Sequence, residues 1–141
     1  MNKILKIIFI LILVLLIITL SFKLLMFNFN LYQKEFSKFN IYEKIPEADK
    51  HALNLINYMN DKENLNSFFN NKEKQHLQDV KNLYKNLVLV FYITLILSLI
   101  LLIYFIYTKN LKIIYKSFLI SSSIIFFLVL LFFFIDFNYL F

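Results

Sequence analysis

The sequence of 141 residues contains no glycine, no cysteine and no arginine, and each absence excludes a class of site. Without cysteine the chain can form no disulfide and no thiolate metal site, and it has no cysteine nucleophile and no cysteine to be lipidated. Without glycine it has no phosphate-cradling loop and no GxGxxG fingerprint. Turns that need a left-handed backbone must therefore fall to other residues, and we expect the abundant asparagines to make them.

The chain has no arginine to make paired hydrogen bonds to phosphates, and its positive charge comes from lysine alone. The formal net charge is +6 at pH 7, but residues 28–85 carry nine lysines and eight acids and are almost neutral. Most of the excess comes from lysines that flank long apolar runs, so the charge is a signal of membrane topology. It is not a patch that would bind nucleic acid, and we exclude a nucleic-acid partner.

Long apolar runs are what the chain has in abundance, since 60% of its residues are hydrophobic. Residues 4–29 include only Lys6 and Lys23 as charges, residues 87–108 are uncharged, and so are residues 117–135. A bilayer core of about 30 Å needs about 20 helical residues. We predict transmembrane helices in residues 1–27, 87–108 and 117–135, because too little other chain exists to bury three such helices in a globular core.

The first run could instead be a cleaved signal peptide, because Lys3 and Lys6 form a basic start. Its apolar part is longer than usual, however, and its exit, SFKLLMFNF, contains no small-x-small cleavage site. We expect an uncleaved anchor.

Two lysine clusters predict the orientation. Lys3 and Lys6 precede the first run, and three lysines lie in the link of residues 109–116. Positive residues stay in the cytoplasm. We therefore expect a cytoplasmic N-terminus and a cytoplasmic loop at 109–116. Residues 28–86 would form an extracellular cap, and 136–141 an extracellular tail.

The cap segment is predicted to be helical. A helix should start after Pro46 and bury Ala48, Ala52 and Leu55, with a turn at residues 60–64. Asn70 and Glu73 then have the spacing of a capping box for a second helix, which can continue into the second span. Several aromatic residues precede these helices and fit either an interfacial belt or contacts to a substrate: Phe27, Phe29, Tyr32, Phe36, Phe39 and Tyr42.

The second cap helix contains the candidate site. His76 and Asp79 share a helix face, and Glu73 lies one turn before the histidine. A carboxylate at that spacing can hold an imidazole tautomer and raise its basicity, as a general base requires. The competing interpretation is a satisfied surface histidine. A metal site is disfavoured because no second histidine has ligand spacing, and His51 is interpreted as solvated or packed.

Residues 66–87, NSFFNNKEKQHLQDVKNLYKNL, resemble the bacterial lipoprotein intramolecular transacylases, an integral membrane family. The match centres on Glu73-x-x-His76-Leu77-x-Asp79-Val80-Lys81, and the order of anchor, cap, motif and two spans agrees along the chain. The resemblance implies a plasma-membrane enzyme that needs no cofactor. It would move the sn-2 acyl chain of a diacylglyceryl lipoprotein onto the amine of that lipoprotein's own N-terminal cysteine. His76 would be one of two catalytic histidines.

The sequence departs from the family after the third span. The resemblance implies an outer loop with the second histidine and then a fourth helix, but this sequence ends at Tyr139-Leu140-Phe141. We therefore expect a truncated or degenerate relative, with a shortened active form as the remaining possibility. The alternative from another class is a small non-enzymatic membrane protein, of an immunity or assembly type, that uses its cap for binding.

Overall fold

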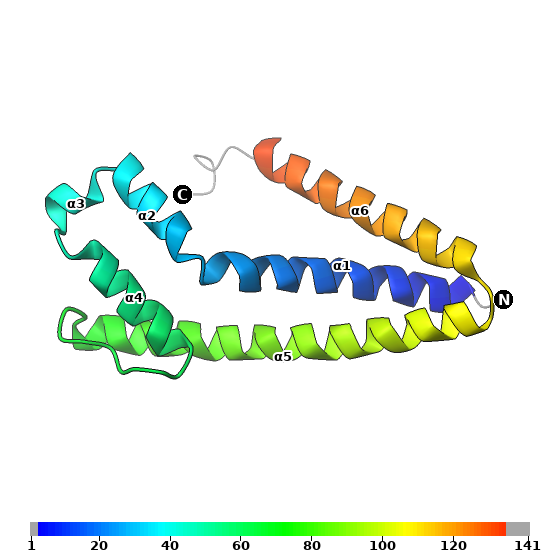
Figure 1. Ribbon diagram of the computed structural model, residues 1–141, viewed down its shortest axis with the longest axis horizontal. Helices are drawn as coiled ribbons and strands as arrows, with labels where there is room; N and C mark the ends of the chain where they lie inside the picture. Colours follow the sequence, from blue (N-terminus) through cyan, green and yellow to red (C-terminus); the bar gives the residue numbers. More distant parts are fainter. Residues whose placement is uncertain (1–2, 135–141) are drawn as a thin grey trace. The chain divides into compact units, whose positions relative to one another are not determined.

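The computed structural model describes residues 3–134, which form helices and no strand. In order along the chain these are α1 (Lys3–Met26), α2 (Phe29–Lys38), α3 (Ile41–Lys44), α4 (Ala48–Met59), α5 (Asn71–Tyr107) and α6 (Leu111–Phe134) (Figure 1). The prediction of an all-α protein is confirmed. The expected tail at residues 136–141 lies outside the described residues.

Three helices are long and apolar enough to cross a membrane: α1, α5 and α6. Many of their large apolar side chains are exposed, including Leu11, Ile96 and Phe126 at 56%, 57% and 66%. Exposed aliphatic and aromatic side chains in such number suit contact with lipid and would be costly in water. The chain is therefore a membrane protein with three spans in its described part, as its composition predicts.

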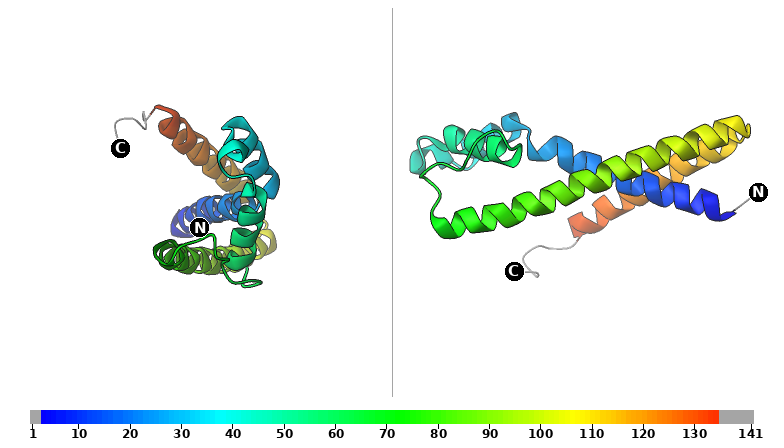
Figure 2. Two further views of the ribbon diagram at one scale, coloured as in Figure 1. Left: turned by 90° about the vertical axis from the view of Figure 1, so that its left-hand side faces the viewer. Right: turned by 90° about the horizontal axis from the view of Figure 1, so that it is seen from below.

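Helix α5 is the longest element, with 37 residues, and it joins the polar motif to the second span without a break. The sequence allowed the second cap helix to continue into the second span, and it does so. Figure 2 shows one uninterrupted ribbon along the whole of α5. Because the helix does not end at residue 86, backbone hydrogen bonds continue from the turn that carries His76 into the apolar run.

The link between α5 and α6 is a short reversal, because α5 ends at Tyr107 and α6 begins at Leu111. The expected cytoplasmic loop at residues 109–116 therefore includes the first turns of α6. The reversal is made by Lys109, whose φ is 56°, and by Asn110, whose side-chain amide donates to Thr108 Oγ1 at 2.9 Å. Lys112 and Lys116 do not stop a helix, because lysine is a good helix former whose charge can reach the membrane surface.

The chain divides into two compact units, and the first comprises residues 1–20 and 90–141. Its core is formed by Phe9 and Leu13 of α1, Phe105 of α5 and Ile113 of α6. The rings of Phe9 and Phe105 lie 5.4 Å apart. Small residues let α6 approach α1: Ser121 is fully buried and its hydroxyl donates to the Ile10 carbonyl at 3.3 Å. Such packing of small residues is typical of helices in membranes.

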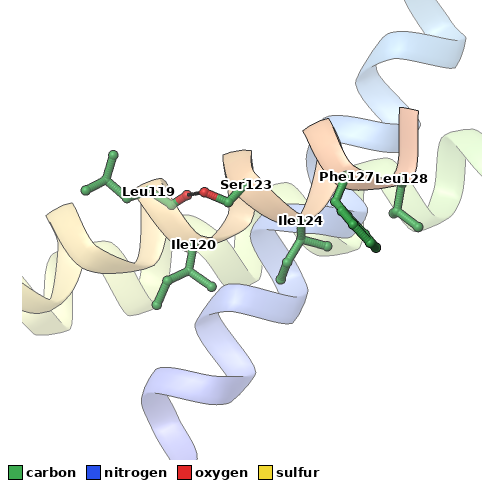
Figure 3. A pocket seen from close by; sticks show the side chains of 6 residues that line it. All are labelled: Leu119, Ile120, Ser123, Ile124, Phe127 and Leu128. Atoms are coloured by element: carbon green, nitrogen blue, oxygen red, sulfur yellow. Dashed lines mark hydrogen bonds between the residues drawn. The ribbon is translucent and has the colours of Figure 1, made fainter. Parts of the chain in front are cut away.

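A shallow cavity of about 510 Å³ lies on α6 in the same unit (Figure 3). All its lining residues belong to that one helix, and they are apolar except Ser123, whose hydroxyl donates back to the Leu119 carbonyl at 2.9 Å. The hydroxyl is thus satisfied within its own helix. This cavity offers no group for catalysis.

The second unit, residues 21–89, is the cap segment with the adjoining ends of α1 and α5. Asp49 of α4 connects three helices: its carboxylate accepts from Gln33 of α2 at 2.9 Å and from the Tyr42 hydroxyl of α3 at 2.7 Å. The hydrogen bond to Asp49 raises the pKa of Tyr42. Ala48 and Ala52 are buried as the periodicity predicts, and their small size suits the approach of α2 to α4.

Left-handed backbone occurs at three described residues: Asn40, Asp61 and Lys109, with φ of 52°, 58° and 56°. In a chain without glycine these positions carry a steric cost that asparagine and aspartate tolerate better than lysine. The expectation that asparagine would make such turns is met by Asn40 alone.

Candidate functional site

His76 lies in the second turn of α5, with its side chain exposed. It lines a cavity of about 510 Å³ together with Phe68 and Phe69 of the preceding loop and Glu73 and Leu77 of its own helix. The imidazole therefore borders a space with both apolar and polar walls. In such a setting an imidazole can exchange a proton with a partly apolar molecule.

The start of α5 holds this histidine in place through a capping box. The backbone N–H of Glu73 donates to Asn70 Oδ1 at 2.9 Å, and the backbone N–H of Asn70 donates to Glu73 Oε2 at 2.8 Å. Two N–H groups that the helix leaves free are satisfied in this way. The predicted capping box is confirmed, and the Glu73 carboxylate is engaged at the helix end.

Asp79 lies three residues after His76 on the same helix and is exposed. It does not line the His76 cavity, and within residues 3–134 no hydrogen bond or ion pair joins it, or Glu73, to the imidazole. The spacing keeps Asp79 within reach of His76 through a change of side-chain rotamer. The structure thus brings Glu73 and His76 to one cavity, and Asp79 is not among the residues that line it.

His51 of α4 is packed, which is one of the two interpretations that its position in the sequence allowed. Its ring stacks on Phe68 with centroids 3.6 Å apart. Its Nδ1 lies 3.3 Å from the amide nitrogen of Asn66. Because an amide NH₂ can only donate, Nδ1 must accept, which places the proton of neutral His51 on Nε2. His51 therefore supports the wall that Phe68 forms beside His76.

A second cavity, of about 230 Å³, lies between α2, α3 and α4 and was not predicted from the sequence. It is lined by Ala52 and Leu55 of α4 and by Phe36 of α2, and it shares Phe68 and Phe69 with the His76 cavity. The periodicity of α4 indicates an apolar face but not that the face would remain partly uncovered.

A buried lysine near the site was also missed. Lys81 of α5 is only 7% exposed. Its Nζ lies 2.9 Å from the Asp61 carboxylate and 3.9 Å from the centre of the Tyr58 ring. Tyr58 also donates to Gln78 Oε1. These contacts join the end of α4 to α5 one turn after His76.

The partner of Lys81 is Asp61 in the turn between the helices, which also binds Lys85 at 2.9 Å. Hydrogen bonds from Lys81 and Lys85 lower the pKa of Asp61. The lysine at position 81 stands out in the sequence only as part of the motif. Its burial depends on Tyr58 and Asp61, at separations of about 20 residues that no local pattern reveals.

Within residues 3–134 no three histidine, cysteine or acidic side chains are grouped as metal ligands would be. An imidazole placed as His76 is, next to apolar walls and a helix start, can transfer protons.

The chain was compared with known protein families, proteins and structures. The family model described as lipoprotein intramolecular transacylase Lit matches residues 7–141. No curated protein and no solved structure matches the chain.

Proposed function

The chain belongs to the lipoprotein intramolecular transacylase family, and on that premise we propose that it moves the sn-2 acyl chain of a diacylglyceryl lipoprotein to the amine of the lipoprotein's own N-terminal cysteine. His76 is the general base. The observation that carries this assignment is the position of His76 on a cavity with apolar walls at the head of a membrane-length helix.

The proposed reaction is an aminolysis within one substrate molecule. The His76 imidazole takes a proton from the cysteine amine as its nitrogen attacks the sn-2 ester carbonyl. An amide C–N bond forms, the bond from the carbonyl to the glyceryl oxygen breaks, and that oxygen receives the proton from the imidazolium. Both partners belong to one lipid-anchored peptide, so the main tasks of the protein are orientation and proton transfer.

The two carboxylates near His76 are assigned different roles. Glu73 keeps the first turn of α5 in place, because its Oε2 already accepts from the Asn70 backbone. Asp79, which is exposed, has no such engagement and orients the imidazole while the substrate is bound. A carboxylate partner favours the imidazolium that forms during the reaction.

The aromatic wall also has a chemical role in this proposal. Phe68 and Phe69 border the His76 cavity without offering hydrogen bonds from their side chains to water. Their rings exclude water from the ester, which disfavours hydrolysis relative to transfer to the amine.

The site is proposed to face the outside of a bacterial plasma membrane. The lysines at positions 3 and 6 and at positions 109, 112 and 116 favour the cytoplasmic side for their segments. Residues 28–86 then lie on the outer side, where lipidated N-termini are accessible.

The proposal is tested by expressing the chain in a strain that lacks such an enzyme and analysing lipoprotein N-termini by mass spectrometry. We expect an N-acyl, lyso-glyceryl cysteine, and the His76→Gln variant should lower its formation by roughly 10²–10⁴-fold, the typical contribution of a general base. Gln75→Ala is the matched control, since Gln75 is exposed and does not line the cavity.

Diacylglyceryl lipoproteins that stay unchanged with the expressed, membrane-inserted chain would overturn the catalytic assignment. The non-enzymatic membrane protein that binds through its cap segment would then be the better account. Product that persists in the His76→Gln variant would contradict the role of His76 while leaving the reaction in place.

A further inference from the structure

The distance along α5 between His76 and the apolar run sets a problem for a lipid substrate. Leu87, the first residue of the apolar run, lies eleven positions after His76 on the same helix. At 1.5 Å per residue these eleven steps span about 16 Å. The polar layer on each side of a bilayer is only about 5–8 Å thick. A helix close to the membrane normal therefore carries His76 beyond the head groups.

Helix tilt alone does not remove this gap. At the usual tilt of about 20° the height is still about 15 Å. An ester that reaches the His76 imidazole must therefore draw the methylenes next to it out of the hydrocarbon core. Exposing these methylenes to water is unfavourable. A protein that binds such a substrate productively needs an apolar surface beside the histidine.

The cavity between α2, α3 and α4 has the composition that this substrate requires. Its floor on α4 is formed by Ala52, which is 8% exposed, and Leu55. Its two polar groups already have partners: the Tyr32 hydroxyl donates to the Met26 carbonyl at 2.9 Å, and His51 contacts Asn66. Among the described residues, His51 and Tyr32 are the only ionisable groups that line the cavity. A hydrocarbon bound there would therefore leave no polar side chain of the cavity without a hydrogen-bond partner.

The wall shared by the two cavities gives the path between them. Phe68 and Phe69 border both the His76 cavity and the α2–α4 cavity. Their rings lie 5.3 Å apart, and Phe68 is fixed from the other side by its stack on His51. A chain whose ester lies at His76 can cross these two rings and enter the apolar space behind them.

We propose that the α2–α4 cavity is an acyl subsite, which holds the methylenes next to the ester of the acyl chain that is transferred. The inference rests on the proposed function for the identity of the lipid. At about 230 Å³ the cavity is smaller than the roughly 300–1,000 Å³ of sites for whole small molecules, so it suits a chain segment and not a head group or peptide.

The test uses a photoreactive substrate and the full chain in lipid nanodiscs. The probe is a synthetic diacylglyceryl-cysteinyl lipopeptide with a diazirine in the first half of its sn-2 chain, and adducts are mapped by mass spectrometry. We expect adducts on residues 32–36, 48–55 and 68–69. Ala52→Phe fills the cavity and should lower these adducts at least tenfold. Leu53→Phe is the control on the same helix, since Leu53 is 43% exposed and does not line the cavity.

A second variant covers the case in which Ala52→Phe fails to fold. Leu55→Ala enlarges the cavity, so it should shift the choice between a straight and a methyl-branched sn-2 chain toward the branched one by at least about tenfold, the usual value of one methyl group in an apolar pocket. The substrates with the two acyl chains compete in one reaction. Both the bound photoreactive probe and the transferred product are quantified for each acyl chain.

The outcomes separate the subsite from the reaction. Cavity adducts without acyl transfer would overturn the proposed function and keep the subsite as a lipid site. Acyl transfer with adducts confined to the apolar spans, or with an unchanged preference in Leu55→Ala, would overturn the subsite and keep the function. Adducts that Leu53→Phe removes as well as Ala52→Phe would also overturn it, because the effect would then not depend on the cavity.

Discussion

Glu73 has two candidate roles, as a partner of His76 and as the capping residue of α5. From spacing it is as good a partner for His76 as Asp79, but its carboxylate accepts from the Asn70 backbone N–H at 2.8 Å. A group that caps a helix needs an acceptor oxygen and not a negative charge. Substitutions that separate these two properties can therefore distinguish a structural role from a catalytic one.

We predict that Glu73→Gln retains most of the acyl transfer, because its amide oxygen can accept the same hydrogen bond. Glu73→Ala should lose the capping box at a cost of about 1 kcal/mol and increase amide hydrogen exchange at residues 71–76. Activity is measured by mass spectrometry of lipoprotein N-termini. Loss of transfer in Glu73→Gln with unchanged exchange would show that the charge itself takes part.

His51 gives a second test at the scale of one residue. Its visible contribution is a ring stacked on Phe68 at 3.6 Å. We predict that His51→Phe, which keeps a flat ring, retains transfer within a few-fold, whereas His51→Ala lowers it by about tenfold because the Phe68 wall loses its support. Transfer rates of the purified variants decide this. If His51→Phe were as inactive as His76→Gln, His51 would have to be a proton carrier.

Asp61 makes the link between α4 and α5 dependent on pH. Hydrogen bonds from Lys81 and Lys85 lower its pKa below the ordinary value of 3.8. A carboxyl whose pKa is lower in the folded state stabilises the fold above its unfolded pKa, and this stabilisation is lost as the pH falls through the folded pKa. We predict faster amide exchange at residues 57–62 in Asp61→Asn than in the wild type at pH 7.

The difference between the two proteins should shrink as the pH falls below about 3.8 and the wild-type carboxyl is protonated. Lys62→Ala is the control, because Lys62 lies in the same turn and is exposed. A difference that is equally large at low and at neutral pH would show that the charge on Asp61 is not its source.

At the scale of elements, local sequence patterns predicted where helices form and which faces are apolar. They did not predict the contacts between residues far apart in the sequence. The apolar face of α4 and the capping box of α5 depend on residues three or four apart, and both are present. The burial of Lys81 and the α2–α4 cavity depend on partners from separate helices. Charge and spacing therefore indicate where His76 lies on its helix but not what surrounds it.

The continuity of α5 yields a prediction for the whole element. Asn86 is an exposed residue inside the helix, just before the apolar run. Asn86→Pro removes one backbone hydrogen bond and introduces a clash, at a cost of about 3 kcal/mol or more. We expect it to lower acyl transfer at least tenfold by displacing the motif from the span. Asn86→Ala should leave activity and circular dichroism unchanged.

If Asn86→Pro were as active as Asn86→Ala while circular dichroism showed a loss of helix, the reaction would not depend on an unbroken α5. The cap segment would then hold His76 by its contacts with α4 alone, such as those of Lys81.

For the whole molecule, the absence of cysteine makes the proposed orientation simple to test. A single cysteine can replace Ser37 in α2 or Asn110 between α5 and α6. Each variant then contains that one thiol and no other. We expect Ser37→Cys to react with a membrane-impermeant maleimide in intact cells, and Asn110→Cys only after permeabilisation. Labelling of both in intact cells, or the reverse pattern, would contradict a cytoplasmic N-terminus.

The left-handed backbone of Lys109 has a practical consequence for protein engineering. Its φ of 56° is adopted by a residue with no compensating local hydrogen bond from its side chain, unlike asparagine or aspartate. Lys109→Gly removes the steric cost of this backbone conformation, but it also increases the conformational entropy of the unfolded chain. We expect the free energy of unfolding to rise by a fraction of a kcal/mol, because the steric term is the larger of the two. Anyone seeking a more heat-resistant version for crystallisation could begin there, adding glycine where the natural sequence uses none.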